Sequence, residues 1–314
     1  MSLPKVELSV VVPVLDEAPS LPILYRELTD VLERLQRPCE IIFVDDGSRD
    51  QSFQILEKLH RQDDRVRVVQ LRRNFGKAAA LSVGFAHARG RIVATLDADL
   101  QDDPAELPRL LAALDEGLDL VSGWKVNRQD PASKTWPSRL FNAVTGRLTG
   151  LPLHDFNSGF KVYRRAVVDE IRLYGELHRF IPALAARRGF AVGEIPVHHR
   201  PRQFGWSKYG AGRFVRGALD LLTVLFLTRY TRRPLHLFGG LGLLSLGVGL
   251  LASLYLTALW LMGVRPIGNR PLLAFGVLAI LVGIQFLSLG LLSELVLSFE
   301  ARNAEEVSIR SRLG

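Results

Sequence analysis

Hydrophobic and polar positions follow two alternating patterns over the first 125 residues. Short runs rich in β-branched residues lie at 7–14, 40–44, 66–71, 91–96 and 118–123, and amphipathic stretches of helical length separate them. This alternation predicts an α/β unit in which helices cover both faces of a mostly parallel sheet. Ligands of such folds usually bind beyond the carboxyl ends of the strands, so the residues that end each run are the first candidates for a site.

Two long apolar runs lie in the last third of the chain. Positions 234–264 hold no Asp, Glu, Lys or Arg over 31 residues, and positions 271–293 hold none over 23. Each run exceeds the roughly 20 residues that a helix needs to cross a hydrocarbon core about 30 Å thick. We therefore predict two transmembrane helices, over about 236–262 and 272–297. A buried core helix is the alternative, but its apolar run is usually only about 10 to 14 residues long.

The charges around these helices predict their orientation. The turn between them, 263–270, is short, so both outer flanks lie on the same side of the membrane. Arginines gather on those flanks, which places them in the cytoplasm by the positive-inside rule, although Arg265 and Arg270 in the turn weaken this bias. The first apolar run, 8–15, ends at two acidic residues, so no secretory leader is expected. The flanking arginines are Arg229, Arg232, Arg233, Arg302, Arg310 and Arg312.

Composition narrows the class of protein. The 314 residues are 48% hydrophobic, which excludes a disordered chain, and the single cysteine, Cys39, excludes an intramolecular disulfide. The net charge of +8 comes entirely from residues 200–314, because residues 1–199 carry 27 basic and 27 acidic side chains. Residues 200–233 alone hold eight basic residues and one acid. Since this segment adjoins the first predicted span, we expect it to meet lipid phosphates and a membrane surface, not nucleic acid.

Four parts of the chain follow from these patterns. Residues 1–205 form the predicted cytoplasmic α/β domain, and 206–233 form a juxtamembrane amphipathic segment in which 214–227 is expected to lie in the membrane interface. Residues 234–298 form the two-helix transmembrane domain, and 299–314 form a cytoplasmic tail.

Small residues recur along the first predicted span. They allow a close contact between helices, and they are also common in membrane spans in general. A homo-oligomer is therefore left open. The residues are Gly239, Gly242, Ser245, Gly249 and Ser253.

Carboxylates follow three of the predicted strands. They lie in Pro-Val-Leu-Asp-Glu at 13–17, Val-Asp-Asp-Gly-Ser at 44–48 and Leu-Asp-Ala-Asp-Leu-Gln at 96–101. One acidic pair after a strand is often a helix cap or a solvated turn, but three pairs at one edge of a sheet favour a ligand site. Asp97 and Asp99 predict a site for a hard divalent cation, Mg²⁺ or Mn²⁺. The phosphates of a nucleotide diphosphate would complete the coordination of this ion. Neither a P-loop nor a G-x-G-x-x-G motif follows the first strand, which excludes two common nucleotide-binding classes.

An ordered set of motifs resembles the family 2 glycosyltransferases of GT-A fold. The particular resemblance is to the polyprenyl-phosphate glycosyltransferases, related to dolichyl-phosphate mannose synthase and to bacterial undecaprenyl-phosphate glucosyl- and aminoarabinosyltransferases. It extends over nearly the whole chain and implies a GT-A domain, Rossmann-like, followed by interfacial helices and two transmembrane helices. The motifs are SVVVPVLDE, VDDGS, LRRNFGKAAALSVG, LDADLQD, HDFNSGFKVYRR and FGWSKYG, followed by the two apolar spans.

The resemblance implies roles for particular residues. Asp155 is the expected polar contact to the sugar or the acceptor, with Ser158 as a weaker companion; a capping residue in a turn is the lesser alternative for Asp155. Lys77 could meet the diphosphate, but a surface lysine at a helix start is the alternative. The implied nucleotide pocket is Pro13, Leu15, Glu17 and Asp46, and the implied metal and diphosphate site is Asp97, Asp99 and Gln101.

The acceptor side needs positive charge more than it needs a base. A phosphate monoester has a second pKa near 6, so a lipid phosphate is already largely dianionic at neutral pH. Whether Asp155 acts as a base or only orients the substrate therefore stays open. The adjacent His198 and His199 would point in opposite directions in an extended segment, so we interpret them as structural. The candidate cations are Arg139, Arg202 and Lys208, with Lys125 and Arg128 as lesser candidates.

The expected activity is an inverting, metal-dependent transfer of a sugar to a polyprenyl phosphate, undecaprenyl or dolichyl. The donor would be a UDP- or GDP-sugar, with UDP-glucose or another UDP-hexose as the first guess. The protein would be integral to the membrane, with the bacterial inner membrane as the expected location and the catalytic domain in the cytoplasm. The alternatives are a nucleotide-sugar-binding scaffold without turnover and a glycosyltransferase with a different membrane-associated acceptor.

Overall fold

The computed structural model divides into two compact units, Met1–Val224 and Leu225–Gly314. Side chains of the final helix are described as far as residue 296. The residues that the structure describes are 6–126, 142, 145–147, 149–173, 175, 177–201, 203–204, 234–264, 266–268 and 270–301.

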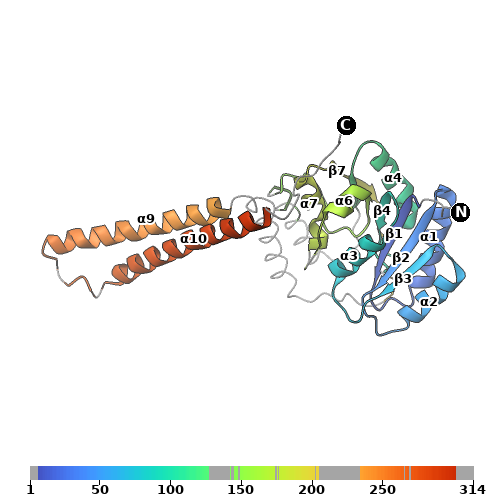
Figure 1. Ribbon diagram of the computed structural model, residues 1–314, viewed down its shortest axis with the longest axis horizontal. Coiled ribbons are helices and arrows are strands. Elements are labelled where there is room, and N and C mark those ends of the chain that lie inside the picture. The colour runs from blue at the N-terminus through green and yellow to red at the C-terminus, as the bar shows by residue number, and fades with distance from the viewer. Residues whose placement is uncertain are drawn as a thin grey trace. The chain divides into compact units, whose positions relative to one another are not determined.

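The first unit is built on a seven-stranded sheet with the order β3-β2-β1-β4-β6-β5-β7 (Figure 1). Strands β1 to β4 are mutually parallel, and the helices α1, α2 and α3 connect them in turn. The ranges are β1 Leu8–Val14, α1 Leu21–Leu35, β2 Cys39–Asp45, α2 Ser52–Gln62, β3 Val66–Gln70, α3 Lys77–His87 and β4 Ile92–Thr95. The predicted mostly parallel α/β arrangement is confirmed, with strand limits within one or two residues.

Three further strands complete the sheet beyond β4. Strand β5, Leu120–Lys125, was expected, whereas β6, Lys161–Arg164, and β7, Val192–Val197, were not. Strand β6 lies between β4 and β5 and runs antiparallel to both, while β7 pairs in parallel with β5. Because β6 runs in the opposite direction, the segment that precedes it reaches the same edge as the carboxyl ends of β4 and β5.

Side chains on the two faces of the sheet pack into two apolar layers. Along β1, Val10, Val12 and Val14 face the layer that helices α1, α2 and α4 cover, whereas Val11 faces the layer of α3, α6 and α7. All four valines are at most 1% exposed, as expected for a strand buried on both faces. The remaining short elements are η1 Pro104–Glu106, α4 Leu107–Asp115, α6 Arg165–Glu170, η2 Leu177–Phe180 and α7 Ile181–Arg187.

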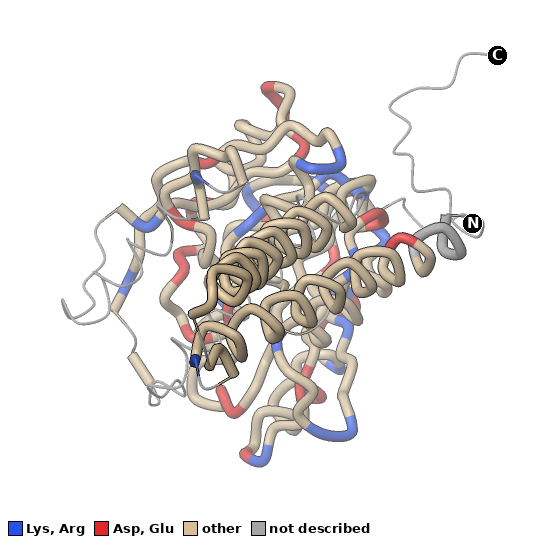
Figure 2. Tube along the Cα trace, turned by 90° about the vertical axis from the view of Figure 1, so that its left-hand side faces the viewer, with Lys and Arg blue, Asp and Glu red and all other residues tan. Residues whose placement is uncertain are grey.

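The second unit is a hairpin of two long helices, α9 Pro234–Leu261 and α10 Pro271–Ala301. Both are long and apolar enough to cross a membrane, and few residues of their most apolar windows are buried, 22% and 11%. A soluble core helix would bury most of its apolar residues, so this exposure agrees with two membrane spans. In Figure 2 both helices are tan along most of their length, whereas blue and red are mixed over the sheet unit.

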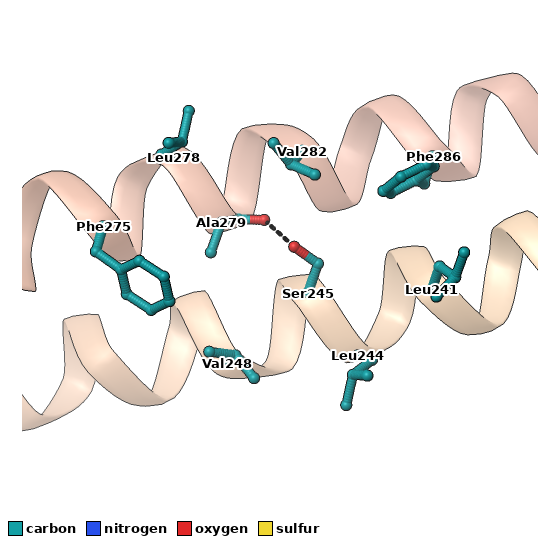
Figure 3. A pocket seen from close by; sticks show the side chains of 9 residues that line it. All are labelled: Leu241, Leu244, Ser245, Val248, Phe275, Leu278, Ala279, Val282 and Phe286. Carbon is teal, nitrogen blue, oxygen red and sulfur yellow. Dashed lines mark hydrogen bonds between the residues drawn. The ribbon is translucent and has the colours of Figure 1, made fainter. Parts of the chain in front are cut away.

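Glycines bring α9 and α10 into close contact. A Cβ at Gly242 would lie 2.9 Å from the carbonyl oxygen of Gly283, and one at Gly249 would lie 2.6 Å from that of Gly276. Ser245 Oγ donates to the carbonyl of Ala279 at 2.8 Å, so this hydroxyl is satisfied across the helix pair (Figure 3). The groove beside this bond is otherwise lined by aliphatic and phenylalanine side chains.

Candidate functional site

The loops that follow β1 and β2 are joined by hydrogen bonds. The amide of Asp16, whose φ is 49°, donates to Ser48 Oγ at 2.9 Å, and Asp16 Oδ1 accepts from the amide of Arg49 at 2.7 Å. The amide of Glu17 donates to Ser52 Oγ at 2.9 Å. These two loops carry the residues that the sequence assigned to the nucleotide pocket. Leu15 and Glu17 lie on the first loop, Pro13 is the second-last residue of β1, and all three are partly exposed.

Asp46 holds the loop that leads into α3. Its Oδ1 accepts from the amide of Phe75 at 2.8 Å, and its Oδ2 accepts from the amide of Gly76 at 2.9 Å. Burial raises the pKa of Asp46, while these two amide hydrogen bonds oppose the rise. Gly76, with φ 94°, occupies the N-cap position of α3, so Asp46 positions the start of that helix and the lysine that follows it. This contact was not foreseen from the sequence.

The first residue of α3 is paired with the first predicted metal ligand. Lys77 Nζ lies 2.5 Å from Asp97 Oδ1, directly beyond the end of β4. Burial alone would raise the pKa of Asp97, but the ammonium groups of Lys77 and Lys125 lower it to about 2. Asp97 therefore stays ionised at neutral pH. The alternative that Lys77 is a plain surface lysine is wrong.

The loop after β4 carries Asp99 and Gln101. Asp99 Oδ1 accepts from the amide of Gln101 at 3.2 Å, and Leu100 between them has a φ of 62°. The carbonyl of Gln101 accepts from the amide of Arg200 at 2.9 Å, so the segment after β7 packs against this loop. The backbone of His199 forms an isolated antiparallel bridge with residue 102, and its ring lies 3.5 Å from the side-chain amide of Gln101.

Segment 155–160 folds over the end of β4. Thr95 Oγ1 donates to the carbonyl of Gly159 at 2.8 Å, and a Cβ on Gly159 would lie 2.4 Å from Asp97 Oδ2. Asp155 is 2% exposed, and its Oδ1 accepts from the amide of Asn157 at 3.0 Å, so the capping turn that was the alternative for this residue is present. Burial lowers the pKa of Lys125, whereas the carboxylates of Asp102, Asp97 and, to a lesser extent, Asp155 raise it, so Asp155 lies within electrostatic reach of that lysine.

Buried lysines surround these carboxylates. Lys125 Nζ lies 2.9 Å from Asp102 Oδ1, and carboxylates raise the pKa of Lys125 above its usual range although burial opposes this. Lys161, the first residue of β6, is 2% exposed and donates to the carbonyl of Ser158. Burial and repulsion from Lys77 lower its pKa to about 8. The site thus combines carboxylates with several cations, which suits a polyphosphate held together with a metal ion.

Two members of this cluster were missed from the sequence. Lys161 stands in an apolar context, Gly-Phe-Lys-Val-Tyr, and a lysine in a buried strand is the signal that could have found it. His178 lies on η2, and burial followed by repulsion from Lys77 lowers its pKa well below the usual range. No local pattern in the sequence predicts that His178 lies at this edge of the sheet.

An aromatic pair lies next to Asp155. The ring of His154 stacks on Trp124 at the end of β5, with centroids 4.1 Å apart and planes 14° from parallel. Both carboxylate oxygens of Glu194 accept from the amide of His154, at 3.0 and 2.9 Å, and the carboxylate also contacts the ring. These contacts fix the orientation of the His154 ring immediately before segment 155–160.

The structure does not describe most of the cations that were predicted to bind the acceptor. Arg139, Arg202, Lys208 and the lesser candidate Arg128 are outside the described residues, as is the interfacial segment 214–227. Their roles therefore stay predictions.

Asp97 and Asp99 fit a divalent cation by the chemistry of their oxygens. Both side chains are partly exposed at the edge of the sheet and supply hard carboxylate ligands. Within the described ranges, no three His, Cys, Asp or Glu side chains gather as a metal centre, so phosphate oxygens of a substrate would have to complete the coordination.

Comparisons with known proteins agree on the family. The family model for Glycosyl transferase family 2 matches residues 9–172. The chain is 41% identical over 299 residues to a dodecaprenyl-phosphate galacturonate synthase from Rhizobium johnstonii, covering 92% of this chain and 87% of the relative. It is 42% identical over 290 residues to an undecaprenyl-phosphate 4-deoxy-4-formamido-L-arabinose transferase from Pseudomonas fluorescens, covering 91% and 83%.

A solved structure shares the fold of the first unit. Glucosyl-3-phosphoglycerate synthase from Mycobacterium tuberculosis, in complex with Mn²⁺ and UDP-glucose, superposes with a TM-score of 0.55 over 71% of this chain and 78% of the other. The two chains are 20% identical, so this likeness shows the GT-A fold alone.

Proposed function

Because this chain belongs to glycosyl transferase family 2, among the polyprenyl-phosphate glycosyltransferases, we propose that it transfers a sugar from a nucleotide-sugar to polyprenyl phosphate. The observation that carries the proposal is the position of Asp97. It lies at the carboxyl end of β4, where Lys77 pairs with it and segment 155–160 covers it. Carboxylates and cations at this edge can bind a diphosphate and its metal ion in one place.

The donor would lie across the carboxyl ends of β1, β2 and β4. The end of β1 and the loop after it would offer Pro13, Leu15 and Glu17 to the nucleoside. Asp46 after β2 would complete this pocket, and its carboxylate also holds the start of α3. Asp97 and Asp99 would hold Mg²⁺ or Mn²⁺, with Gln101 beside them. When bound, the metal ion would neutralise the negative charge that builds up on the departing nucleoside diphosphate. These assignments are proposals, supported by the shared edge of the sheet.

The transfer would be a direct displacement at the anomeric carbon. A phosphate oxygen of the lipid attacks that carbon as its bond to the diphosphate breaks, which inverts the configuration. The lipid phosphate is already largely dianionic at neutral pH, so orientation and positive charge matter more than a base. The buried carboxylate of Asp155, beside Lys125, would orient the sugar. Arg139, Arg202 and Lys208 are proposed to bind the lipid phosphate, and Ser158 to assist at the donor side.

The identity of the transferred sugar is the most specific part of the proposal. UDP-glucose was the first expectation, but the printed names of the relatives give galacturonate and 4-deoxy-4-formamido-L-arabinose instead. We therefore propose a donor panel that includes the nucleotide-linked forms of these two sugars beside UDP-glucose.

The enzyme is proposed to work at the cytoplasmic face of the bacterial inner membrane. The two apolar helices and the lipid acceptors named for the relatives support a membrane location. Orientation can be tested with Gly268→Cys, which lies exposed in the turn between α9 and α10, in a Cys39→Ser background. A membrane-impermeant maleimide added to intact cells should label residue 268. Labelling only after lysis would contradict the orientation.

The activity test uses the full chain in detergent with undecaprenyl phosphate, Mg²⁺ or Mn²⁺ and the donor panel. Mass spectrometry of the extracted lipid should show one sugar added through the phosphate. Asp99→Ala should lose this product, whereas Asp64→Ala, in the exposed turn before β3, should keep it. Full activity of Asp99→Ala would contradict the metal assignment. Transfer only to a soluble acceptor would contradict the lipid acceptor, and tight donor binding without turnover would favour the scaffold alternative.

A further inference from the structure

The ammonium of Lys77 lies where a metal ion would meet Asp97. Its Nζ is 2.5 Å from Oδ1, and both side chains are only about a quarter exposed, at 25% and 27%. The backbone of Lys77 is held by its neighbours, since Asp46 accepts the amide hydrogens of Phe75 and Gly76 immediately before it. The ion pair of Lys77 and Asp97 therefore joins two partly buried side chains, and the backbone of the lysine is held in place by Asp46.

From this geometry we propose that Lys77 is the resident cation of Asp97 in the donor-free enzyme, and that the lysine and the divalent metal exclude each other there. The inference rests on the proposed metal dependence of the reaction. It assigns to Lys77 a role that the reaction itself does not require, namely to occupy the metal-binding carboxylate as its counter-ion until the donor arrives.

Two physical reasons make the cations mutually exclusive. Mg²⁺ binds its oxygen ligands at about 2.0 to 2.1 Å, and Oδ1 already accepts the ammonium at 2.5 Å, so two cations on this oxygen would lie close enough to repel each other strongly. The carboxylate of Asp97 has little freedom to turn so that it binds the ammonium and the metal ion together, because the backbone of Gly159 lies against it. Without any cation, Asp97 would be a partly buried charge with poor compensation, which is costly.

The exclusion predicts how metal and nucleotide bind. Metal alone must displace Lys77 from Asp97, so it should bind weakly. A metal ion that arrives with a diphosphate brings an anion for the displaced ammonium, so metal and nucleotide should strengthen each other's binding. Linkage requires this coupling to be reciprocal, and removing the ammonium should reduce it.

The test measures Mn²⁺ binding by the full chain in detergent, from the electron paramagnetic resonance signal of free Mn²⁺. Without nucleotide, Lys77→Met should bind Mn²⁺ roughly 10-fold tighter than the parent protein, because competition and like-charge repulsion are both removed. Lys58→Met, which removes an exposed lysine from α2, is the matched control for net charge and should leave the affinity unchanged. Added UDP should tighten Mn²⁺ binding in the parent protein more than in Lys77→Met.

The outcomes separate this inference from the proposed function. Equal or weaker Mn²⁺ binding by Lys77→Met, in a parent protein whose Mn²⁺ binding is lost in Asp99→Asn, would overturn the inference and leave metal dependence intact. A parent protein that binds no Mn²⁺ even with UDP would overturn both. If Lys77→Met does not fold, Lys77→Gln provides the same loss of charge with a shorter polar side chain, and circular dichroism of each variant verifies the fold.

Discussion

The backbone of Gly159 lies against the carboxylate of Asp97. A Cβ at position 159 would be 2.4 Å from Oδ2 and 2.7 Å from Oδ1, closer than real Cβ atoms approach other atoms. The segment before β6 therefore forms one wall of the predicted metal site, and only glycine leaves room for the carboxylate. This contact joins residues 62 positions apart in the chain.

The first prediction concerns this contact. Gly159→Ala should displace Asp97 or the segment above it, and we expect kcat/KM to fall by roughly 100-fold, about 2.7 kcal/mol in transition-state stabilisation. The measurement is sugar transfer to polyprenyl phosphate at varied donor concentration. Gly240→Ala is the control, because a Cβ there meets no atom within 4 Å. Unchanged kcat/KM in Gly159→Ala would show that Asp97 need not stay where it lies.

The second prediction concerns the loop that places Lys77. Asp46→Ala leaves the amides of Phe75 and Gly76 without their acceptors, which should cost about 1 to 3 kcal/mol of stability and raise the KM for the donor. Asp46→Asn keeps one acceptor oxygen and should lose less. Thermal unfolding and donor kinetics of both variants test this. The interpretation fails if the two variants behave alike and match the parent protein.

The third prediction is a pH dependence at the opposite edge of the sheet. Glu40 is 1% exposed and accepts from Ser9 Oγ at 2.6 Å and from the amide of Arg89 at 2.7 Å. Burial alone would raise the pKa of Glu40, but these hydrogen bonds and the Arg89 guanidinium together hold it below the usual value. The folded state thus has the lower pKa, so Glu40 contributes stability above about pH 4.3 that is lost as the pH falls through its folded pKa.

Glu40→Gln should therefore flatten the loss of thermal stability between about pH 5 and pH 3, and should lower stability at pH 7 by about 2 kcal/mol. Circular dichroism melts across this pH range provide the measurement. Glu57→Gln is the control, because Glu57 forms an exposed pair with Arg61 on α2. An acid transition in Glu40→Gln as steep as in the parent protein would exclude Glu40 as its source.

The fourth prediction concerns the helix hairpin. Gly249→Val should force α9 and α10 apart, because even a Cβ at this position would lie 2.6 Å from the carbonyl oxygen of Gly276 and 2.7 Å from Ile280 Cγ1. We expect a loss of about 1 to 3 kcal/mol in the stability of the hairpin. Thermal aggregation in detergent measures it, and Gly247→Val, where a Cβ would meet nothing within 4 Å, should be nearly neutral. Equal melting of both variants would argue against the close helix contact.

Much of the fold could be predicted from local patterns. Strands β1 to β5 and both long helices were found because hydrophobic periodicity and the absence of charge are properties of neighbouring residues. Strand β6 was not found, because a four-residue strand that contains Lys161 and Arg164 has no clear period of its own. Its place between β4 and β5 depends on pairing with residues 39 to 72 positions away.

The sequence predicted the carboxylates of the candidate site but not the contacts that these carboxylates make. Asp97 and Asp99 could be named because three strands end in acidic residues at one edge of the sheet. The sequence left two roles open for Lys77 and did not identify Lys161 as a site residue. A lysine at a helix start or in a strand carries no local pattern that indicates its partner. Asp46 was assigned to the nucleotide pocket, which stays a prediction, and the sequence did not show that its carboxylate also accepts from the amides before α3.

The sequence by itself determined the class of fold, the two apolar spans and the kind of chemistry at the carboxyl edge, because these depend on composition and on the spacing of nearby residues. Only the tertiary structure decided that Lys77 meets Asp97, that Gly159 forms the wall beside it and that Lys161 is buried beneath. Such contacts depend on strand order and register. These arise from the packing of the whole sheet and cannot be obtained from any single segment.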